Sequence, residues 1–260
     1  MILDELAAHA RERVAAAKAK VPLDEVKAAA EALPRGDFRF EKALSGPDAA
    51  FICEVKKASP SKGVIDEHCD YLAAAMQYEE AGADCVSVLT EPKWFLGSDE
   101  IFRAIRLMID IPMLRKDFTV DEYQIYEAKM MGADAVLLIC ALLDIETLRA
   151  YLGICDALGL SALVEAHDEV EVAAAVAAGA RVIGVNNRNL KDFTVDLNNA
   201  ARLRQNAPSG TIFVAESGVC SPEDAKTLRR AGADALLVGE YLMRSLDKHQ
   251  TIKTLREAVK

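Results

Sequence analysis

One repeated tract constrains the fold of this chain more than any other feature. Four times, a Gly-Ala pair and a charged residue are followed directly by an apolar run of the kind found in buried strands. The glycines are Gly82, Gly132, Gly179 and Gly232, which stand 50, 47 and 53 residues apart. Glycine in this place is typical of a helix end, so each tract predicts a helix that leads into a buried strand.

The spacing of the repeats predicts the number of strands. One strand and its helix need about 25–30 residues, so a period near 50 holds two such units and four repeats hold eight. The runs after the glycines cover 85–89, 135–139, 182–185 and 235–238, and further candidate strands lie at 51–56, 112–116, 160–165 and 211–216. Eight alternating units predict an α/β fold, the (β/α)8 or TIM barrel. An open doubly wound sheet is the alternative, but it does not predict a fourfold repeat.

The chain length fits this architecture as a single domain over residues 1–260. Residues 1–47 precede the first strand and form an N-terminal helical extension. Apolar residues recur there at helical spacing, for example at Leu3, Leu6 and Ala10, and Pro22 and Pro34 interrupt the pattern. We expect this extension to cover one end of the barrel.

Composition excludes several classes of protein. The net charge of −10 argues against nucleic acid or an anionic membrane as a partner. The longest apolar run, 135–143, is too short to cross a bilayer, and the charged N-terminus is no signal peptide. Six scattered cysteines without a Cys-x-x-Cys pair predict reduced thiols and a cytoplasmic protein. The oligomeric state stays open between a monomer and a weak dimer.

The first predicted strand, 51–56, contains charged residues although we expect it to be buried. Glu54 and Lys56 are two residues apart, so their side chains share one face of the strand. A Ser/Pro/Gly loop with Lys62 follows. The pair is either a structural ion pair or part of a polar site at the carboxyl end of the strand.

The other strands end in polar residues too, and in this fold the carboxyl ends meet at one rim, where the active site lies. The rim residues are Glu54, Lys56, Thr90, Glu91, Lys116, Glu165, Asn186, Arg188, Glu216, Ser217, Gly218, Gly239 and Glu240. Their convergence predicts a polar pocket. Ser217, Gly218 and Gly239 follow the last two of the eight strands, where small residues let backbone N–H groups approach a phosphate, and Ser221-Pro222 predicts a helix start nearby.

Lys56, Lys116 and Glu165 are the candidates for acid–base chemistry. A lysine whose pKa is lowered in a dry pocket can donate a proton near neutral pH, and a carboxylate can accept one. Each lysine could instead be a fixed counter-charge for a substrate anion, and the sequence does not separate these roles. His167 lies two residues after Glu165, but no third ligand has suitable spacing, so we expect a helix start at 168–169 and no metal.

Several tracts resemble those of the indole-3-glycerol phosphate synthase family. They are Glu54-Val55-Lys56-x-x-Ser59-Pro60-Ser61-Lys62-Gly63, Thr90-Glu91 through Trp94-Phe95-x-Gly97-Ser98, Leu114-Arg115-Lys116-Asp117-Phe118, Leu163-Val164-Glu165, Asn186-Asn187-Arg188-Asn189-Leu190, Glu216-Ser217-Gly218 and Gly239-Glu240. The resemblance covers essentially the whole chain, including the N-terminal extension. Trp94 stands where Phe or Tyr is expected, and Glu240 where Ser is frequent.

The resemblance implies a carboxy-lyase of tryptophan biosynthesis. It would close the ring of 1-(2-carboxyphenylamino)-1-deoxyribulose 5-phosphate, with loss of carbon dioxide and water, and would need no metal or organic cofactor. Lys116 would be the general acid, Glu165 the general base and Lys56 a second acid or electrostatic partner. Glu54, Asn186 and Glu216 would hold hydroxyls and orient the lysines.

The same likeness assigns the substrate-binding residues. Ser59 would orient the first loop, and Arg188 would face the departing carboxylate. The phosphate would lie against Lys56 and the backbone of Ser217, Gly218, Gly239 and Glu240. The residues that would enclose the anthranilate ring are Phe95, Phe118, Leu137, Leu190 and Leu237.

Two other readings remain open. One is a related phosphate-binding barrel of different chemistry, either a sugar-phosphate isomerase or an aldolase that forms a Schiff base on Lys116 or Lys56. The other is a barrel that binds a metabolite without turnover, which would leave the acid–base set unexplained.

Overall fold

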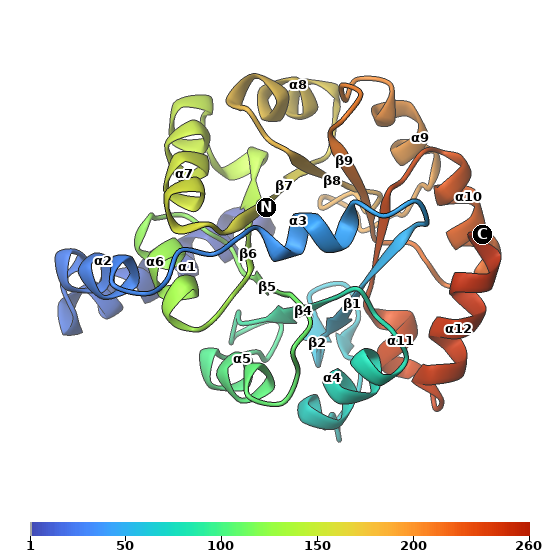
Figure 1. Cartoon of the computed structure of the whole chain (residues 1–260), viewed down its shortest axis with the longest axis horizontal. Coiled ribbons are helices and arrows are strands. Elements are labelled where there is room, and N and C mark those ends of the chain that lie inside the picture. The colour runs from blue at the N-terminus through green and yellow to red at the C-terminus, as the bar shows by residue number, and fades with distance from the viewer. Residues whose placement is uncertain (1) are drawn as a thin grey trace.

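A computed structural model describes residues 2–260, and its centre is a closed barrel of eight parallel strands (Figure 1). Around the ring the order is β1-β10-β9-β8-β7-β6-β5-β4. The strands are β1 (Ala50–Val55), β4 (Cys85–Leu89), β5 (Met113–Lys116), β6 (Ala135–Ile139), β7 (Ser161–Ala166), β8 (Val182–Asn186), β9 (Ile212–Glu216) and β10 (Ala235–Val238). The predicted barrel is confirmed. Strand β5 begins one residue later than expected, since Pro112 has no N–H for the ladder.

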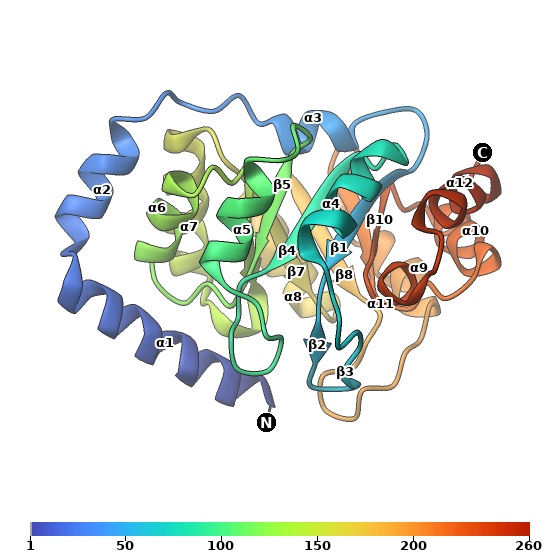
Figure 2. The same cartoon turned by 90° about the horizontal axis from the view of Figure 1, so that it is seen from below.

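Helices surround the barrel and connect consecutive strands (Figures 1 and 2). They are α4 (Tyr71–Glu80), α5 (Asp99–Arg106), α6 (Tyr123–Met130), α7 (Ile145–Leu158), α8 (Glu169–Ala178), α9 (Asn198–Arg204) and α10 (Pro222–Arg230), and after β10 come α11 (Glu240–Arg244) and α12 (Lys248–Ala258). A 3₁₀ turn, η1 (Cys140–Leu142), follows β6, and a small hairpin of β2 (Ala58–Ser59) and β3 (Gly63–Val64) projects from the carboxyl end of β1.

The repeated tract has a physical basis in the structure. All four glycines adopt a positive φ, between 82° and 94°, which lets the chain leave each helix and turn into the next strand. In three repeats the following aspartate then accepts a backbone N–H from the preceding strand: Asp84 from Phe51, Asp134 from Met113 and Asp234 from Phe213, at 2.7–2.9 Å. In these three repeats the aspartate therefore ties one strand to the next.

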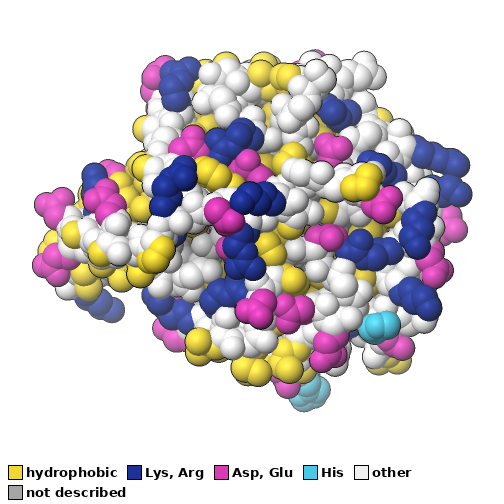
Figure 3. Space-filling view, viewed as in Figure 1, with side chains coloured by type: hydrophobic (Ala, Val, Ile, Leu, Met, Phe, Trp, Pro, Cys, Tyr) yellow, Lys and Arg dark blue, Asp and Glu magenta, His cyan; other side chains and the backbone are white. Residues whose placement is uncertain are grey.

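The core has two layers. One fills the barrel interior with residues such as Ile52, Leu114, Leu163 and Val214, and the other lies between strands and helices. Helix α3 (Arg39–Leu44) crosses the amino ends of the strands, in front in Figure 1, and its two buried apolar side chains belong to the interior layer. Figure 3 shows this face, where basic and acidic side chains intermingle.

The N-terminal extension wraps around one side of the barrel (Figure 2). Helix α1 (Ile2–Lys20) and helix α2 (Leu23–Glu31) are separated at Pro22, as the sequence predicts, and both contact α6. The start of α1 lies near the carboxyl ends of the strands, opposite α3. None of the helices in residues 2–260 is long and apolar enough to cross a membrane.

Candidate active site

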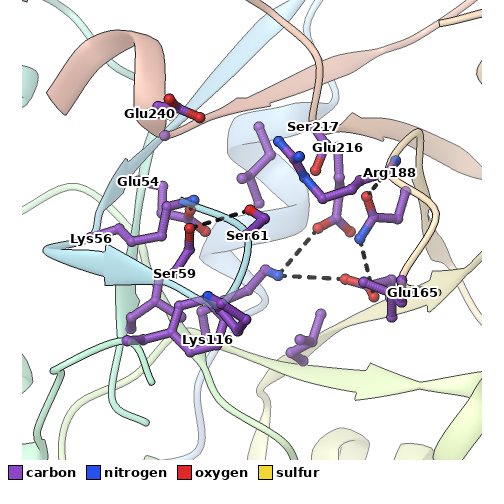
Figure 4. A pocket seen from close by; sticks show the side chains of 18 of the residues that line it. Glu54, Lys56, Ser59, Ser61, Lys116, Glu165, Arg188, Glu216, Ser217 and Glu240 are labelled. Atoms are coloured by element: carbon purple, nitrogen blue, oxygen red, sulfur yellow. Dashed lines mark hydrogen bonds and ion pairs between the residues drawn. The ribbon is translucent and has the colours of Figure 1, made fainter. Parts of the chain in front are cut away.

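A cluster of charged side chains occupies the carboxyl end of the barrel. Lys116 ends β5, and its Nζ lies 3.4 Å from Oε2 of Glu165 on β7 and 3.4 Å from Oε2 of Glu216 on β9. Figure 4 shows the three side chains pointing toward one another. Both carboxylates are almost fully buried. The rim that the sequence predicts is therefore confirmed for these residues.

The electrostatics of this cluster differ from the simplest expectation. Burial favours loss of the Lys116 proton, but Glu216, Glu165 and Glu54 outweigh it, so the pKa of Lys116 is raised. The lowered lysine pKa considered from the sequence does not hold in the structure. Lys116 is thus protonated, and it is a poor amine nucleophile.

The two carboxylates around Lys116 behave differently. Burial raises the pKa of Glu216 to about 8; attraction to Lys116 opposes this, and repulsion by Glu165 and Glu54 adds to it. Burial would also raise the pKa of Glu165, but Lys116 and His167 outweigh it and hold it below its usual range. In residues 2–260, Oε1 of Glu216 finds no hydrogen-bond partner. Near neutral pH the site therefore keeps a proton on Glu216 and leaves Glu165 ionised.

A second ion pair lies at the end of β1. The Nζ of Lys56 donates to Oε1 of Glu54 at 2.6 Å, and Ser87 approaches the other carboxylate oxygen at 3.4 Å. Burial raises the pKa of Glu54, but the cations of Lys56 and Lys116 more than offset it, so the pKa is lowered. This pair lines the same pocket as Lys116, so it belongs to the site and is not an isolated structural ion pair.

Two glycines make room for these carboxylates. A Cβ at Gly239 would lie 2.6 Å from Oε1 of Glu54 and 3.0 Å from Nζ of Lys56, and a Cβ at Gly184 would collide with Oε1 of Glu216. Gly184 is in the middle of β8, and the sequence analysis assigned it no role in the site.

Asn186 ends β8, and Arg188 follows two residues later. The amide of Asn186 donates to Oε1 of Glu165 at 3.5 Å, and its carbonyl oxygen accepts the backbone N–H of Arg188 at 3.0 Å. The guanidinium of Arg188 donates to the carbonyl of Phe193 at 3.2 Å, which holds its side chain over the pocket (Figure 4). The sequence placed both residues correctly at the pocket.

The predicted phosphate cradle lies on the β9 and β10 side. Ser217 and Gly218 both have positive φ, 64° and 97°, and they line the pocket together with Gly239 and Glu240. As predicted, Ser221 caps α10, by accepting the N–H of Asp224 at 3.2 Å. Above the first strand, Ser59 is buried in the β2–β3 hairpin and its hydroxyl lies 3.4 Å from that of Ser61.

An apolar wall, to which several elements including β10 contribute, also lines the pocket. The rings of Phe95 and Phe118 lie 6.1 Å apart, and all five apolar residues expected around the ring line the pocket: Phe95, Phe118, Leu137, Leu190 and Leu237. Ile2 and Leu6 from helix α1 line it as well. The sequence predicted that the extension covers one end of the barrel but assigned neither residue to the site.

Glu91 and Thr90, expected on the rim, do not line the pocket. The buried carboxylate of Glu91 accepts the backbone N–H groups of Lys93, Trp94 and Phe95 at 2.8–3.1 Å. It also lies 3.1 Å from Nδ1 of His9. Thr90 donates to Asp117 at 2.6 Å. Thr90 and Glu91 support the neighbouring loops and do not face the pocket, because both residues lie beyond the end of β4.

The described residues contain no cluster of His, Cys, Asp or Glu suited to a metal ion. As expected, the sequence after Glu165 begins a helix, with Asp168 as the cap of α8. The pocket lining thus brings together the ammonium groups of Lys56 and Lys116, several carboxylates, an arginine, an amide and an apolar wall. This set can transfer protons, bind an anion and enclose an aromatic ring in one cavity.

Comparison with solved structures supports the barrel fold. Similar solved structures include a 3-hexulose-6-phosphate synthase, with a TM-score of 0.64 and 18% identity over 81% of this chain and 100% of that one. A thiamine phosphate pyrophosphorylase from Pyrococcus furiosus has a TM-score of 0.60 and 17% identity over 81% of this chain and 95% of that one. At these identities the likeness shows the barrel fold alone.

Sequence relatives are more informative. An indole-3-glycerol phosphate synthase of Ruminiclostridium cellulolyticum is 54% identical over 98% of this chain and 99% of its own length. That of Lachnoclostridium phytofermentans is 44% identical over 98% of this chain and 99% of its own length. The family model described as "Indole-3-glycerol phosphate synthase" matches residues 3–255. The chain therefore belongs to the indole-3-glycerol phosphate synthase family.

Proposed function

We propose that the pocket at the carboxyl end of the barrel converts 1-(2-carboxyphenylamino)-1-deoxyribulose 5-phosphate into indole-3-glycerol phosphate, carbon dioxide and water. The protein is a carboxy-lyase of tryptophan biosynthesis. The observation that carries the proposal is Lys116, held between Glu165 and Glu216 beside an apolar wall. No metal or organic cofactor takes part in the proposed reaction.

Ring closure begins with proton donation by Lys116. As its ammonium protonates the ribulose carbonyl oxygen, the ring carbon that bears the carboxylate bonds to the carbonyl carbon. The C–CO₂ bond then breaks, and its electron pair restores the aromatic ring. Phe95 and Phe118 enclose that ring, and Arg188 faces the carboxylate before it leaves, so charge is lost in a largely dry pocket.

Dehydration completes the product. Glu165, which is ionised, removes a proton from the new five-membered ring, and the hydroxyl formed from the carbonyl leaves as water after protonation by Lys56, because Lys116 has already given its proton to the carbonyl oxygen. Glu54 and Asn186 hold the sugar hydroxyls. Glu216, which takes up or releases a proton near pH 8, supports Lys116.

The phosphate binds on the other side of the pocket. Ser217, Gly218, Gly239 and Glu240 supply backbone N–H groups, and Lys56 supplies a cation. Ser59 orients the hairpin that covers this end. The two ends of the substrate thus meet different walls, which fixes the reacting carbons near Lys116.

Two features of the whole chain complete the proposal. Residues 1–260 form one domain, in which the extension over 1–47 contributes Ile2 and Leu6 to the apolar wall. We place the protein in the cytoplasm, where its six free cysteines would stay reduced.

The rival aldolase chemistry needs a neutral lysine to attack a carbonyl. The raised pKa of Lys116 disfavours that form. The direct test is to incubate the purified protein with the carboxyphenylamino sugar phosphate and follow indole fluorescence. We expect turnover without added metal. Tight binding without turnover, or inactivation by borohydride in the presence of substrate, would overturn the proposal.

A further inference from the structure

His167 lies between two carboxylates at the edge of the site, directly after β7. Its Nε2 is 3.3 Å from Oε1 of Glu165, and its Nδ1 is 3.0 Å from Oε2 of Glu171 on α8. The same oxygen of Glu171 accepts the backbone N–H of His167 at 2.8 Å. Glu171 therefore hydrogen-bonds the imidazole at Nδ1, whereas Nε2 has no hydrogen-bond partner within residues 2–260 and meets the proposed base, Glu165, at ion-pair distance.

The two oxygens of Glu165 face different groups. Oε2 lies beside the ammonium of Lys116 inside the pocket, whereas Oε1 lies beside His167 and the amide of Asn186. A carboxylate can rotate and exchange its oxygens unless both are held. The imidazole thus occupies the position that keeps Oε2 turned toward Lys116 and the substrate.

We propose that His167 is a positioning residue for Glu165, which holds the carboxylate ionised and oriented, and that Glu171 holds the imidazole in turn. This inference rests on the proposed role of Glu165 as general base. It adds the charged pair of His167 and Glu171 to the groups that serve the acid–base chemistry.

The chemistry of the ring nitrogens supports a charged imidazole. A neutral imidazole donates from one nitrogen only, and an ionised carboxylate only accepts, so two flanking carboxylates are both satisfied by an imidazolium. Burial opposes the charge, but the neighbouring carboxylates of Glu165 and Glu171 outweigh it and raise the pKa of His167 to about 10. The imidazolium then contributes to the lowered pKa of Glu165.

The other groups around this contact do not replace that charge. From β5 comes Lys116, on the far oxygen of Glu165. Neutral side chains come from β8, with Asn186, and from α9, where Asn199 donates to the carbonyl of His167 at 3.4 Å. From η1 comes Cys140, whose thiol pKa is raised by burial to about 12 and which is therefore neutral.

A purely structural role is the alternative, because the same residues begin α8. Asp168 accepts the N–H of Glu171 at 2.9 Å, and Glu171 reaches back to the N–H of His167, one residue before the cap, so the two bonds resemble a capping box. Asp168 is therefore a matched control: Asp168→Ala weakens the same helix start without touching Glu165.

The experiment compares His167→Ala, Glu171→Gln and Asp168→Ala by kcat, KM and the pH profile of kcat. For His167→Ala we expect kcat to fall at least about tenfold with KM within about twofold. The pH below which kcat declines should rise, because Glu165 loses a neighbouring cation. Glu171→Gln should move kcat and this pH in the same direction by less, and Asp168→Ala should lower Tm alone.

The inference is overturned if His167→Ala keeps the kcat and pH profile of the parent, or if Asp168→Ala reproduces its defect. Should His167→Ala fail to fold, Glu171→Gln against Asp168→Ala decides by the same readings. Glu165→Gln is measured in parallel. If that variant turns over normally, the assignment of the base is wrong; if it is inactive while His167→Ala is normal, only the role of His167 is wrong.

Discussion

The ammonium of Lys116 reaches across the mouth of the barrel to within 3.4 Å of a carboxylate oxygen of Glu216. Their strands, β5 and β9, lie on opposite sides of the ring, with three strands between them in either direction. This contact exists only because the sheet is closed. The contact places the ammonium of Lys116 at the centre of the pocket, within reach of a carbonyl group bound against any of its walls.

Removal of that ammonium tests its role as an acid. Lys116→Ala should lower kcat by on the order of a hundredfold or more, because no proton donor remains at the carbonyl, while affinity for inorganic phosphate stays largely unchanged. Steady-state indole fluorescence and calorimetric phosphate binding measure the two quantities. Lys226→Ala, on the exposed face of α10, is the control. A large loss of affinity with normal turnover would reassign Lys116 to substrate binding.

The proton on Glu216 predicts a pH dependence of stability. The pKa of Glu216 is about 8 in the folded protein and exceeds the ordinary 4.5. The contribution of this carboxyl to the free energy of unfolding is therefore fully present below pH 4.5 and is lost as the pH rises through 8. The free energy of unfolding should therefore decline over this range by up to a few kcal/mol. In Glu216→Gln, which cannot ionise, we expect a smaller decline between pH 5 and 9.

Urea unfolding at fixed pH values measures this difference. Glu146→Gln is the control, since Glu146 is an exposed carboxylate on α7 and should leave the slope unchanged. His167, whose pKa of about 10 lies above the ordinary 6.5, adds a decline of the same sign that persists in both variants. Equal slopes for the parent and Glu216→Gln would show that Glu216 is ionised in the folded protein.

The cradle on the β10 side predicts an effect on binding. Gly239→Val should raise the dissociation constant for inorganic phosphate and KM by about tenfold or more, because even the first carbon of a side chain meets Glu54 at 2.6 Å and Lys56 at 3.0 Å. Gly153→Ala is the control: its Cβ meets nothing within 4 Å, and alanine favours helix α7. Unchanged phosphate affinity in Gly239→Val would place the phosphate elsewhere.

Glu91 predicts a link between the extension and the aromatic wall. Without this carboxylate, the loop that carries Phe95 loses three hydrogen bonds, and the contact between Glu91 and His9 is lost as well. Glu91→Ala should therefore raise KM for the aromatic substrate by about tenfold and leave inorganic phosphate affinity near normal. Glu80→Ala, on the surface of α4, is the control. Equal losses for substrate and phosphate would indicate general destabilisation instead.

The sequence by itself determined the strands, their number and the residues at their carboxyl ends. Those features depend on local periodicity, on glycine at helix ends and on a repeat, and each can be read from neighbouring residues. For that reason the strand limits agree within about a residue, and Lys116, Glu165 and Glu216 were found without coordinates.

Only the tertiary structure decided what each rim residue faces. Barrel closure brings Gly184 against Glu216, places His167 beside Glu165, turns Glu91 away from the pocket and carries Ile2 of the extension over its mouth. These contacts join segments far apart in the chain, or depend on how the backbone turns after a strand. No local pattern encodes them, because their geometry follows from the twist and closure of the whole sheet.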